Sequence, residues 1–336
     1  MLKTLDQKLE RILADRSVED FIIADAKDAD MGFGLAAPGV NFGDDRTRRP
    51  FHTMEQYRDN MRKITEQGLV DIMLMSASTS EQLTIVERLF DDSAVTPAVR
   101  ANDTTDIWCG MSGGYGNQPA RNFRSATLDH IQCGKIHCEP EERKRGADLG
   151  LYSMTFNNDR DLDLEALECY REFRLEAESK QFRHFLEVFT PNAPGRNTPA
   201  DIPRYVNDCI VRCLAGVTSI ARPLFLKMPY YGPAAMEQLA SYDASIIPGI
   251  LGGPAGTTHD AFRMLWEAKK YGGRAALFGR KINIAEDQLA FVTVLRALAD
   301  GNIQPLEAVK DYHGRLQSAS IKPNRTLDDD LKLTQL

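Results

Sequence analysis

The sequence has no long hydrophobic run and no block of basic residues, and it contains only six Cys and two Trp among 336 residues. Its apolar runs are far shorter than the roughly 20 residues that cross a bilayer as a helix. The 41 Lys and Arg residues are scattered among 48 Asp and Glu residues, for a net charge of −7. This pattern argues against nucleic acid and anionic membranes as partners. Unevenly placed cysteines in so long a chain are typical of reduced thiols.

The N-terminal segment, residues 1–17, is charged and amphipathic. It has neither the apolar core nor the small-residue cleavage site of a secretory signal. With the reduced cysteines, this predicts a cytoplasmic protein. The chain is 43% hydrophobic and 26% charged, which is the composition of a folded globular protein with a large core.

Short apolar runs alternate with stretches of helical periodicity, which is the pattern of a βα repeat. The predicted strands are residues 21–26, 71–77, 94–101, 149–156, 184–190, 223–230, 246–251 and 275–279. The predicted helices include residues 54–68, 80–92, 164–180, 257–273 and 286–301. Capping residues predict helix starts at Thr53, Ser80 and Thr257 or Thr258. Eight such units favour an α/β fold, a closed (β/α)8 TIM barrel, over an open doubly wound sheet.

We expect residues 1–336 to form a single barrel domain, since such barrels commonly exceed about 250 residues as one unit. Two long loops interrupt the minimal pattern, at residues 34–52 after strand one and at residues 102–147 after strand three. Both follow strand C-termini, which form the catalytic face of such a barrel. The second is either a functional element of this face or an insertion that is disordered or contacts another subunit.

Lys227 stands near the end of an otherwise apolar predicted strand, in FLKMPYYGP. Alternation along the strand turns it inward with Phe225. Burial disfavours a charged amine, and a neutral amine is a nucleophile for a carbonyl carbon. Glu187, in HFLEVFTPN, points inward from the adjacent strand by the same rule. The pair either transfers protons for a Schiff base or forms a structural salt bridge.

Glycines follow predicted strands seven and eight at Gly252, Gly253 and Gly279, and Arg280 comes next. Glycine lets backbone amides approach an anion, and the N-terminus of the helix after strand seven adds positive potential. Barrels often bind phosphate with the loops after strands seven and eight. We therefore predict a phosphate site here, although glycines also serve turns.

Strand one ends in ADAKDADM, so Asp25, Lys27 and Asp28 are candidates to project from the rim toward the centre and contact substrate. Three tyrosines, one on strand four and two after Lys227, are candidate proton donors: Tyr152, Tyr230 and Tyr231. For each tyrosine taken alone, ordinary core packing is the simpler explanation.

Two other patterns carry no site. Cys133, His137, Cys138 and Glu139 lie close in sequence but lack the second half of a zinc motif, and we expect no metal. The glycine-rich residues 110–116 lack the strand, the helix and the Gly-Lys-Thr ending of a nucleotide loop. They read as a flexible loop.

These motifs together resemble the DeoC/LacD/FbaB superfamily of class I aldolases, which includes archaeal-type fructose-bisphosphate and tagatose-bisphosphate aldolases. LFLKMPYYG resembles the strand of the Schiff-base lysine, and FLEVFT resembles the glutamate strand. ILGGPAGT and ALFGRKI resemble the phosphate-binding strand ends, and IIADAKDADMG resembles the first strand.

The resemblance implies reversible aldol cleavage of a ketose phosphate by a carbon–carbon lyase of carbohydrate metabolism. It assigns the nucleophile to Lys227, proton transfer to Glu187, and substrate contact to Asp25. It also implies a sugar phosphate substrate held at the predicted phosphate site, no cofactor, no catalytic metal and a homo-oligomer. The tagatose enzymes carry a lysine on strand four, whereas this chain offers Tyr152 there.

Two alternatives remain open from the residues alone. A metal-dependent aldolase or lyase on the same barrel needs clustered ligands, but the six histidines do not recur at inward strand ends. A phosphosugar-binding barrel without catalysis keeps the phosphate site but has no use for Lys227 beside Glu187.

Overall fold

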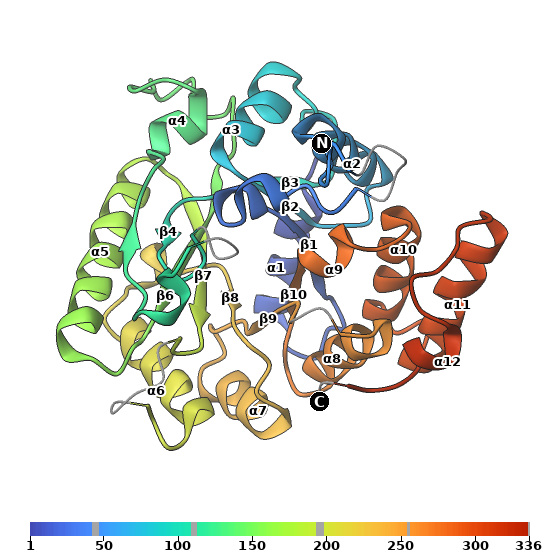
Figure 1. Cartoon of the computed structure of the whole chain (residues 1–336). Coiled ribbons are helices and arrows are strands. Elements are labelled where there is room, and N and C mark those ends of the chain that lie inside the picture. The colour runs from blue at the N-terminus through green and yellow to red at the C-terminus, as the bar shows by residue number, and fades with distance from the viewer. Residues whose placement is uncertain (42–46, 109–112, 193–197, 254–255, 335–336) are drawn as a thin grey trace.

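Eight parallel strands form the centre of the fold and helices surround them (Figure 1), as the alternating pattern predicts. The computed structural model describes residues 1–41, 47–108, 113–192, 198–253 and 256–334. In barrel order the strands are β8 (Leu226–Lys227), β7 (Arg183–Phe189), β6 (Leu149–Thr155), β3 (Thr96–Arg100), β2 (Ile72–Met75), β1 (Ile22–Lys27), β10 (Ala275–Phe278) and β9 (Gly249–Leu251). The (β/α)8 barrel is confirmed.

The two outermost strands in this order, β8 and β9, also meet and close the barrel. Met228 pairs with Ile250 in a parallel bridge, and the Leu226 amide donates to the Ile247 carbonyl at 2.9 Å. Gly249 permits this approach, because a Cβ there would lie 2.4 Å from the Leu226 carbonyl oxygen. Both strands are shorter than predicted. Prolines at 223, 229 and 248 lack the amide that a longer ladder would need.

Apolar side chains fill the barrel interior. This cluster consists of Ile22, Ala24, Ala26, Ile72, Leu74, Ala98, Leu149, Leu151, Phe185, Phe225, Ile247, Ala275 and Leu277. Helix α1 (Thr4–Ala14) adds three leucine and isoleucine side chains to it. The helix bonds to carbonyls that precede β1 and β3, at Phe21 and Ala94. It therefore covers the end of the barrel where the strands begin, and leaves the other end for a site.

The outer faces of the strands pack against the helices. These are α2 (Met54–Gln67), α3 (Ala77–Ser80), α5 (Arg160–Ser179), α6 (Ile202–Leu214), α7 (Pro233–Tyr242), α8 (Thr258–Lys270), α9 (Arg280–Asn283), α10 (Gln288–Ala299), α11 (Pro305–Ser318) and α12 (Leu327–Asp330). The predicted caps Thr53 and Thr257 are confirmed, each accepting from the amide three residues later. The predicted cap Ser80 is wrong. Ser76, directly after β2, caps α3, which continues as a π-helix over Glu81–Val86.

Most of the long segment after β3 folds onto the barrel. It contains a two-stranded sheet, β4 (Asp103–Thr104) with β5 (Asn122–Phe123), and helix α4 (Leu128–Cys133). Leu128 and Ile131 of α4 are buried in the core on that side. Residues 109–112 of this segment, 42–46 of the segment after β1, and 254–255 of the glycine loop lie outside the described residues.

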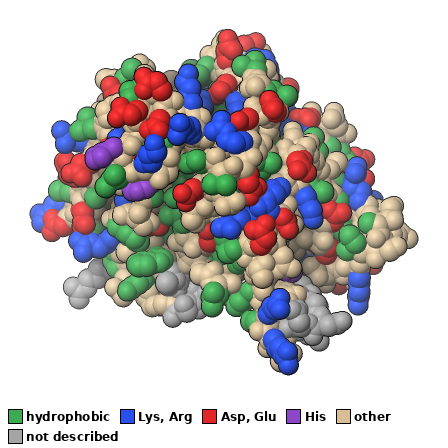
Figure 2. Space-filling view, turned by 90° about the horizontal axis from the view of Figure 1, so that it is seen from above, with side chains coloured by type: hydrophobic (Ala, Val, Ile, Leu, Met, Phe, Trp, Pro, Cys, Tyr) green, Lys and Arg blue, Asp and Glu red, His purple; other side chains and the backbone are tan. Residues whose placement is uncertain are grey.

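Charged side chains of both signs lie on the surface of the molecule (Figure 2). Figure 2 shows basic and acidic side chains interspersed over one face of the molecule, in keeping with the scattered charges of the sequence. Within the described residues, no helix combines the length and the apolar character that crossing a bilayer requires.

Candidate functional site

A pocket of about 250 Å³ opens at the end of the barrel where the strands finish. Its walls come from the ends of β1, β3, β7, β8, β9 and β10 and from the segments that follow them. The lining residues are Ala26, Asp28, Ala29, Gly32, Phe33, Arg100, Ile107, Glu187, Phe189, Lys227, Leu251, Gly252, Gly253, Leu277, Gly279 and Arg280. The pocket therefore brings together seven of the residues that the sequence singled out: Lys227, Glu187, Asp28, Arg280, Gly252, Gly253 and Gly279.

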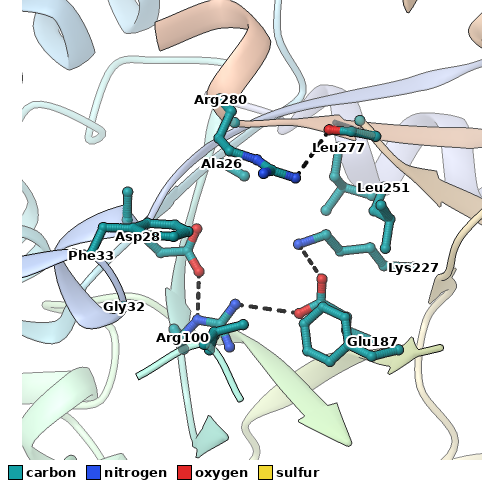
Figure 3. A pocket seen from close by; sticks show the side chains of 16 residues that line it. Ala26, Asp28, Gly32, Phe33, Arg100, Glu187, Lys227, Leu251, Leu277 and Arg280 are labelled. Atoms are coloured by element: carbon teal, nitrogen blue, oxygen red, sulfur yellow. Dashed lines mark hydrogen bonds and ion pairs between the residues drawn. The ribbon is translucent and has the colours of Figure 1, made fainter. Parts of the chain in front are cut away.

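Lys227 and Glu187 form a buried ion pair in this pocket (Figure 3), with Nζ of Lys227 2.6 Å from Oε1 of Glu187. The two residues are register partners on β8 and β7. Two positions earlier along the chain, Phe185 of β7 and Phe225, which directly precedes β8, face inward and stack with ring centroids 4.7 Å apart. The alternation that the sequence indicated thus sets both charged groups on top of an apolar floor.

Arg100, at the end of β3, reaches across to the same glutamate. Its Nη2 lies 3.3 Å from Oε2 of Glu187 and its Nε 2.6 Å from Oδ2 of Asp28. Ser153 of β6 donates to Oε2 of Glu187 at 2.6 Å and accepts from Nη1 of Arg100 at 3.0 Å. These bonds fix the glutamate, because both of its oxygens are engaged. The sequence interpretation did not single out Arg100 or Ser153, although an arginine at an inward position of an apolar strand is as unusual as Lys227.

Asp28 is the acid of the first strand's end that lines the pocket. Burial alone would raise its pKa, but the charges of Arg100 and Lys227 outweigh burial and lower it below its ordinary value. Carboxylate and cation thus alternate around the pocket, in the order Lys227, Glu187, Arg100 and Asp28 (Figure 3).

Asp25 and Lys27 do not project toward the centre, contrary to the expectation from the sequence. They lie on the outer face of β1, since the alternate residues Ala24 and Ala26 face the interior. Both are fully buried, with Nζ of Lys27 2.9 Å from Oδ2 of Asp25. Burial raises the pKa of Asp25 and lowers that of Lys27. This pair is outside the pocket lining.

The glycines of the predicted phosphate site lie in the pocket wall beside Arg280. A Cβ at Gly252 would lie 2.7 Å from the Phe278 ring, and one at Gly279 would lie 2.5 Å from the Ala26 carbonyl oxygen. Close packing of neighbouring strand ends therefore requires both glycines. Arg280 is exposed, and its Nη2 donates to the Gly253 carbonyl at 3.2 Å. No described carboxylate pairs with its guanidinium, so it can receive an anion.

The N-terminus of α8 is not available to a phosphate, which corrects the prediction that it contributes to the site. Oδ1 of Asp330 accepts from the Thr258 amide at 2.7 Å, and the Thr257 hydroxyl donates to the Lys332 carbonyl. Asp260 in the first turn in turn accepts from the amide and hydroxyl of Thr334. The C-terminal segment therefore occupies this helix end with a carboxylate of its own.

The tyrosines and the cysteine cluster lie elsewhere. Tyr152 faces outward from β6 and packs against Tyr170 and Phe173 at 5.0 and 4.6 Å, away from the pocket lining. Tyr230 and Tyr231 are not in the pocket lining but line a neighbouring cavity, which shares Leu251, Gly252 and Gly253 with the pocket. Cys133 and Cys138 are buried beside each other in the segment after β3, and no group of three or more His, Cys, Asp or Glu among the described residues could hold a metal ion.

No protein-family model and no curated protein matches the sequence. Solved structures do match the fold. An archaeal fructose 1,6-bisphosphate aldolase superposes with a TM-score of 0.60 at 14% identity, over 88% of this chain and 99% of the aldolase. A Schiff-base-forming fructose-1,6-bisphosphate aldolase gives 0.60 at 16% identity, with the same coverage. A protein of Corynebacterium glutamicum gives 0.53 at 16% identity, over 89% of this chain and 94% of that protein. The chain therefore has the barrel fold that these aldolases share.

Proposed function

We propose that the protein is a class I aldolase that cleaves a phosphorylated ketose, or a related carbonyl compound, through a Schiff base on Lys227. The observation that carries the proposal is the ion pair of Lys227 and Glu187, inside a pocket that also contains Arg280, with which no described carboxylate pairs. Unlike the buried pair of Asp25 and Lys27, this pair lines the pocket, so a carbonyl compound can reach its amine. The fold shared with a Schiff-base-forming aldolase agrees with this reading.

The residues supply each proton transfer that the reaction needs. The amine of Lys227 loses a proton to Glu187 and attacks the ketone carbon, which gives a carbinolamine. Glu187 returns the proton to the carbinolamine hydroxyl, which leaves as water, and an iminium remains. Arg100 and Ser153 hold Glu187 in reach of the nitrogen throughout.

Carbon–carbon cleavage requires a base for the substrate hydroxyl next to the breaking bond. Asp28 can act as this base, since it lines the pocket and the charges of Arg100 and Lys227 keep its carboxylate ionised and able to accept a proton. It accepts the hydroxyl proton, the aldehyde departs, and the bonding electrons move to the iminium to form an enamine. Asp28 then gives its proton to the enamine carbon, and water adds to the resulting iminium and releases the ketone product from Lys227. Arg280 would hold the phosphate of the ketone half.

Reductive trapping tests the proposal. The protein is incubated with dihydroxyacetone phosphate, pyruvate or hydroxyacetone, with and without sodium borohydride, and its intact mass is measured. We expect a stable mass increase with at least one ketone, and none in Lys227→Met. No increase with any of them, or an equal increase in Lys227→Met, contradicts the proposal.

The two alternatives lack a supporting observation in the described residues. A phosphosugar-binding protein would bind sugar phosphates without turnover, and Lys227→Met would leave binding unchanged. A metal-dependent lyase would lose activity with a chelator, whereas the Schiff-base mechanism predicts full activity in the chelator's presence.

A further inference from the structure

We propose that the aldehyde half of the substrate is neutral and apolar or aromatic, and does not carry a second phosphate. This inference rests on the proposed Schiff-base function and concerns the other half of the same pocket. It follows from the unequal chemistry of the walls on the two sides of Lys227.

One side of the pocket is suited to an anion. It is formed by the ends of β9 and β10, which carry Gly252, Gly253 and Gly279, and by Arg280. In Figure 3 the Arg280 side chain reaches over the open space toward Lys227. A ketone bound to Lys227 can therefore place one phosphate against this guanidinium.

The other side of the pocket has no cation to spare among the described residues. Arg100 is the arginine that lines it, and Asp28 and Glu187 already engage its guanidinium at 2.6 and 3.3 Å. Arg100 is 4% exposed, so a ligand has little access to it. Because the guanidinium of Arg100 is already shared by two carboxylates and the amine of Lys227 is needed for the ketone, this side offers no described cation for a second phosphate.

The remaining wall on this side is apolar. Phe33 follows β1, Ile107 follows β3, and Phe189 ends β7, and all three line the pocket while only partly buried. A Cβ at Gly32 would lie 3.2 Å from the Ile107 carbonyl oxygen, so the segments after β1 and β3 touch and form one continuous wall. Apolar side chains left partly open in a cavity favour an apolar ligand.

An aromatic cluster follows Ile107 in the same segment. Trp108, next to Ile107, is 45% exposed and packs in a tilted arrangement against Phe123 at 5.2 Å and Tyr115 at 6.5 Å. Tyr115 is itself 46% exposed. Exposed aromatic rings beside an apolar lining residue are suited to contact with apolar groups. On this side of the pocket the carboxylate of Asp28 can accept a hydrogen bond from the hydroxyl that forms from the aldehyde.

The test measures aldol synthesis from dihydroxyacetone phosphate with three acceptors: phenylacetaldehyde, glyceraldehyde and glyceraldehyde 3-phosphate. We expect kcat/KM to be at least about tenfold higher with phenylacetaldehyde than with glyceraldehyde 3-phosphate, the scale on which apolar pockets discriminate. Borohydride trapping of dihydroxyacetone phosphate on Lys227 is measured in parallel. Trapping together with a preference for glyceraldehyde 3-phosphate overturns this inference alone. Absence of trapping with dihydroxyacetone phosphate, pyruvate and hydroxyacetone alike overturns the proposed function, and this inference with it.

Matched variants locate the effect on the wall. Phe33→Ala and Ile107→Ser should each lower kcat/KM for phenylacetaldehyde by about tenfold and leave the yield of trapped dihydroxyacetone phosphate unchanged, which also shows that the variants fold. Leu35→Ala, in the same segment but 88% exposed and outside the lining, should behave as the parent. Phe33→Arg should shift the preference toward glyceraldehyde 3-phosphate. Equal kinetics with all acceptors in every variant contradicts the inference.

Discussion

Nζ of Lys227 and Oε1 of Glu187 lie 2.6 Å apart, on register partners of adjacent strands. Glu187→Gln keeps the size of the side chain but removes the proton acceptor. We expect the rate of borohydride-trappable adduct formation to fall by about 10²- to 10⁴-fold, the usual contribution of a positioned acid or base. Stopped-time trapping followed by mass measurement gives this rate. Glu178→Gln, at an exposed carboxylate, is the control, and a parent-like rate in Glu187→Gln would remove Glu187 from the mechanism.

Asp25 and Lys27 should act as a structural pair. Lys27→Met leaves a buried carboxylate without its partner, and we expect it to lower the free energy of unfolding by about 3–5 kcal/mol. In Asp25→Val/Lys27→Met neither charge remains, so most of this loss should be recovered. Urea denaturation measures both variants. The double variant should still form the trapped adduct on Lys227. A folded double variant that forms no adduct would show that Asp25 or Lys27 is needed for the reaction, and would contradict a purely structural role.

Asp330 should stabilise the protein through the helix end that it occupies. Its carboxylate accepts from the Thr258 amide and lies 3.0 Å from Nε2 of His313. Asp330→Ala removes a cap and a favourable charge at a helix N-terminus, so we expect a loss of about 1–2 kcal/mol. Thermal and urea unfolding give the value. Asp328→Ala, at an exposed neighbour in α12, should change stability little, and equal losses in the two variants would contradict the capping role.

Lys281 should make the free energy of unfolding depend on pH between about 8 and 10.5. Burial lowers the pKa of Lys281 to about 8, and its Nζ donates to the Gly256 carbonyl at 2.7 Å. Between this pKa and the ordinary value of 10.5, the unfolded chain binds a proton that the folded chain does not. The stability contributed by this lysine is therefore complete above 10.5 and is lost as pH falls through 8.

The expected size of this effect is about 3 kcal/mol, because one pKa unit corresponds to about 1.4 kcal/mol. Urea unfolding of the parent should show the free energy of unfolding rising over this range relative to Lys281→Met. Lys310→Met, at an exposed lysine of α11, should keep the slope of the parent. Identical slopes in Lys281→Met and the parent would contradict the assignment.

The barrel and its central pair were predictable because they depend on local regularities. Eight apolar runs in alternation with helical stretches specify the topology. The two-residue period of a strand turns Lys227 and Glu187 inward once their neighbours Phe225 and Phe185 are placed. The same period applied to residues 94–101 would have turned Arg100 inward beside Ala98. This signal was available in the sequence and was not used.

Other features had no local signal. Every residue of β1 is buried, so hydrophobicity does not tell which face of the strand points into the barrel. For this reason the sequence favoured Asp25 as the acid that contacts substrate, whereas Asp28 is the one that lines the pocket. Asp330 caps α8 from 72 residues away, a contact that no motif near Thr258 announces. The short β8 and β9 strands reflect prolines whose missing amides outweigh the apolar pattern.

The most direct test of the account identifies which lysine carries the adduct. The protein trapped with its ketone and borohydride is digested, and the modified peptide is sequenced by mass spectrometry. The account predicts the added mass on Lys227, and none on Lys281, whose amine has a lowered pKa but binds Gly256 outside the pocket. A reduced adduct on Lys281, or one spread over surface lysines with Lys227 unmodified, would contradict it.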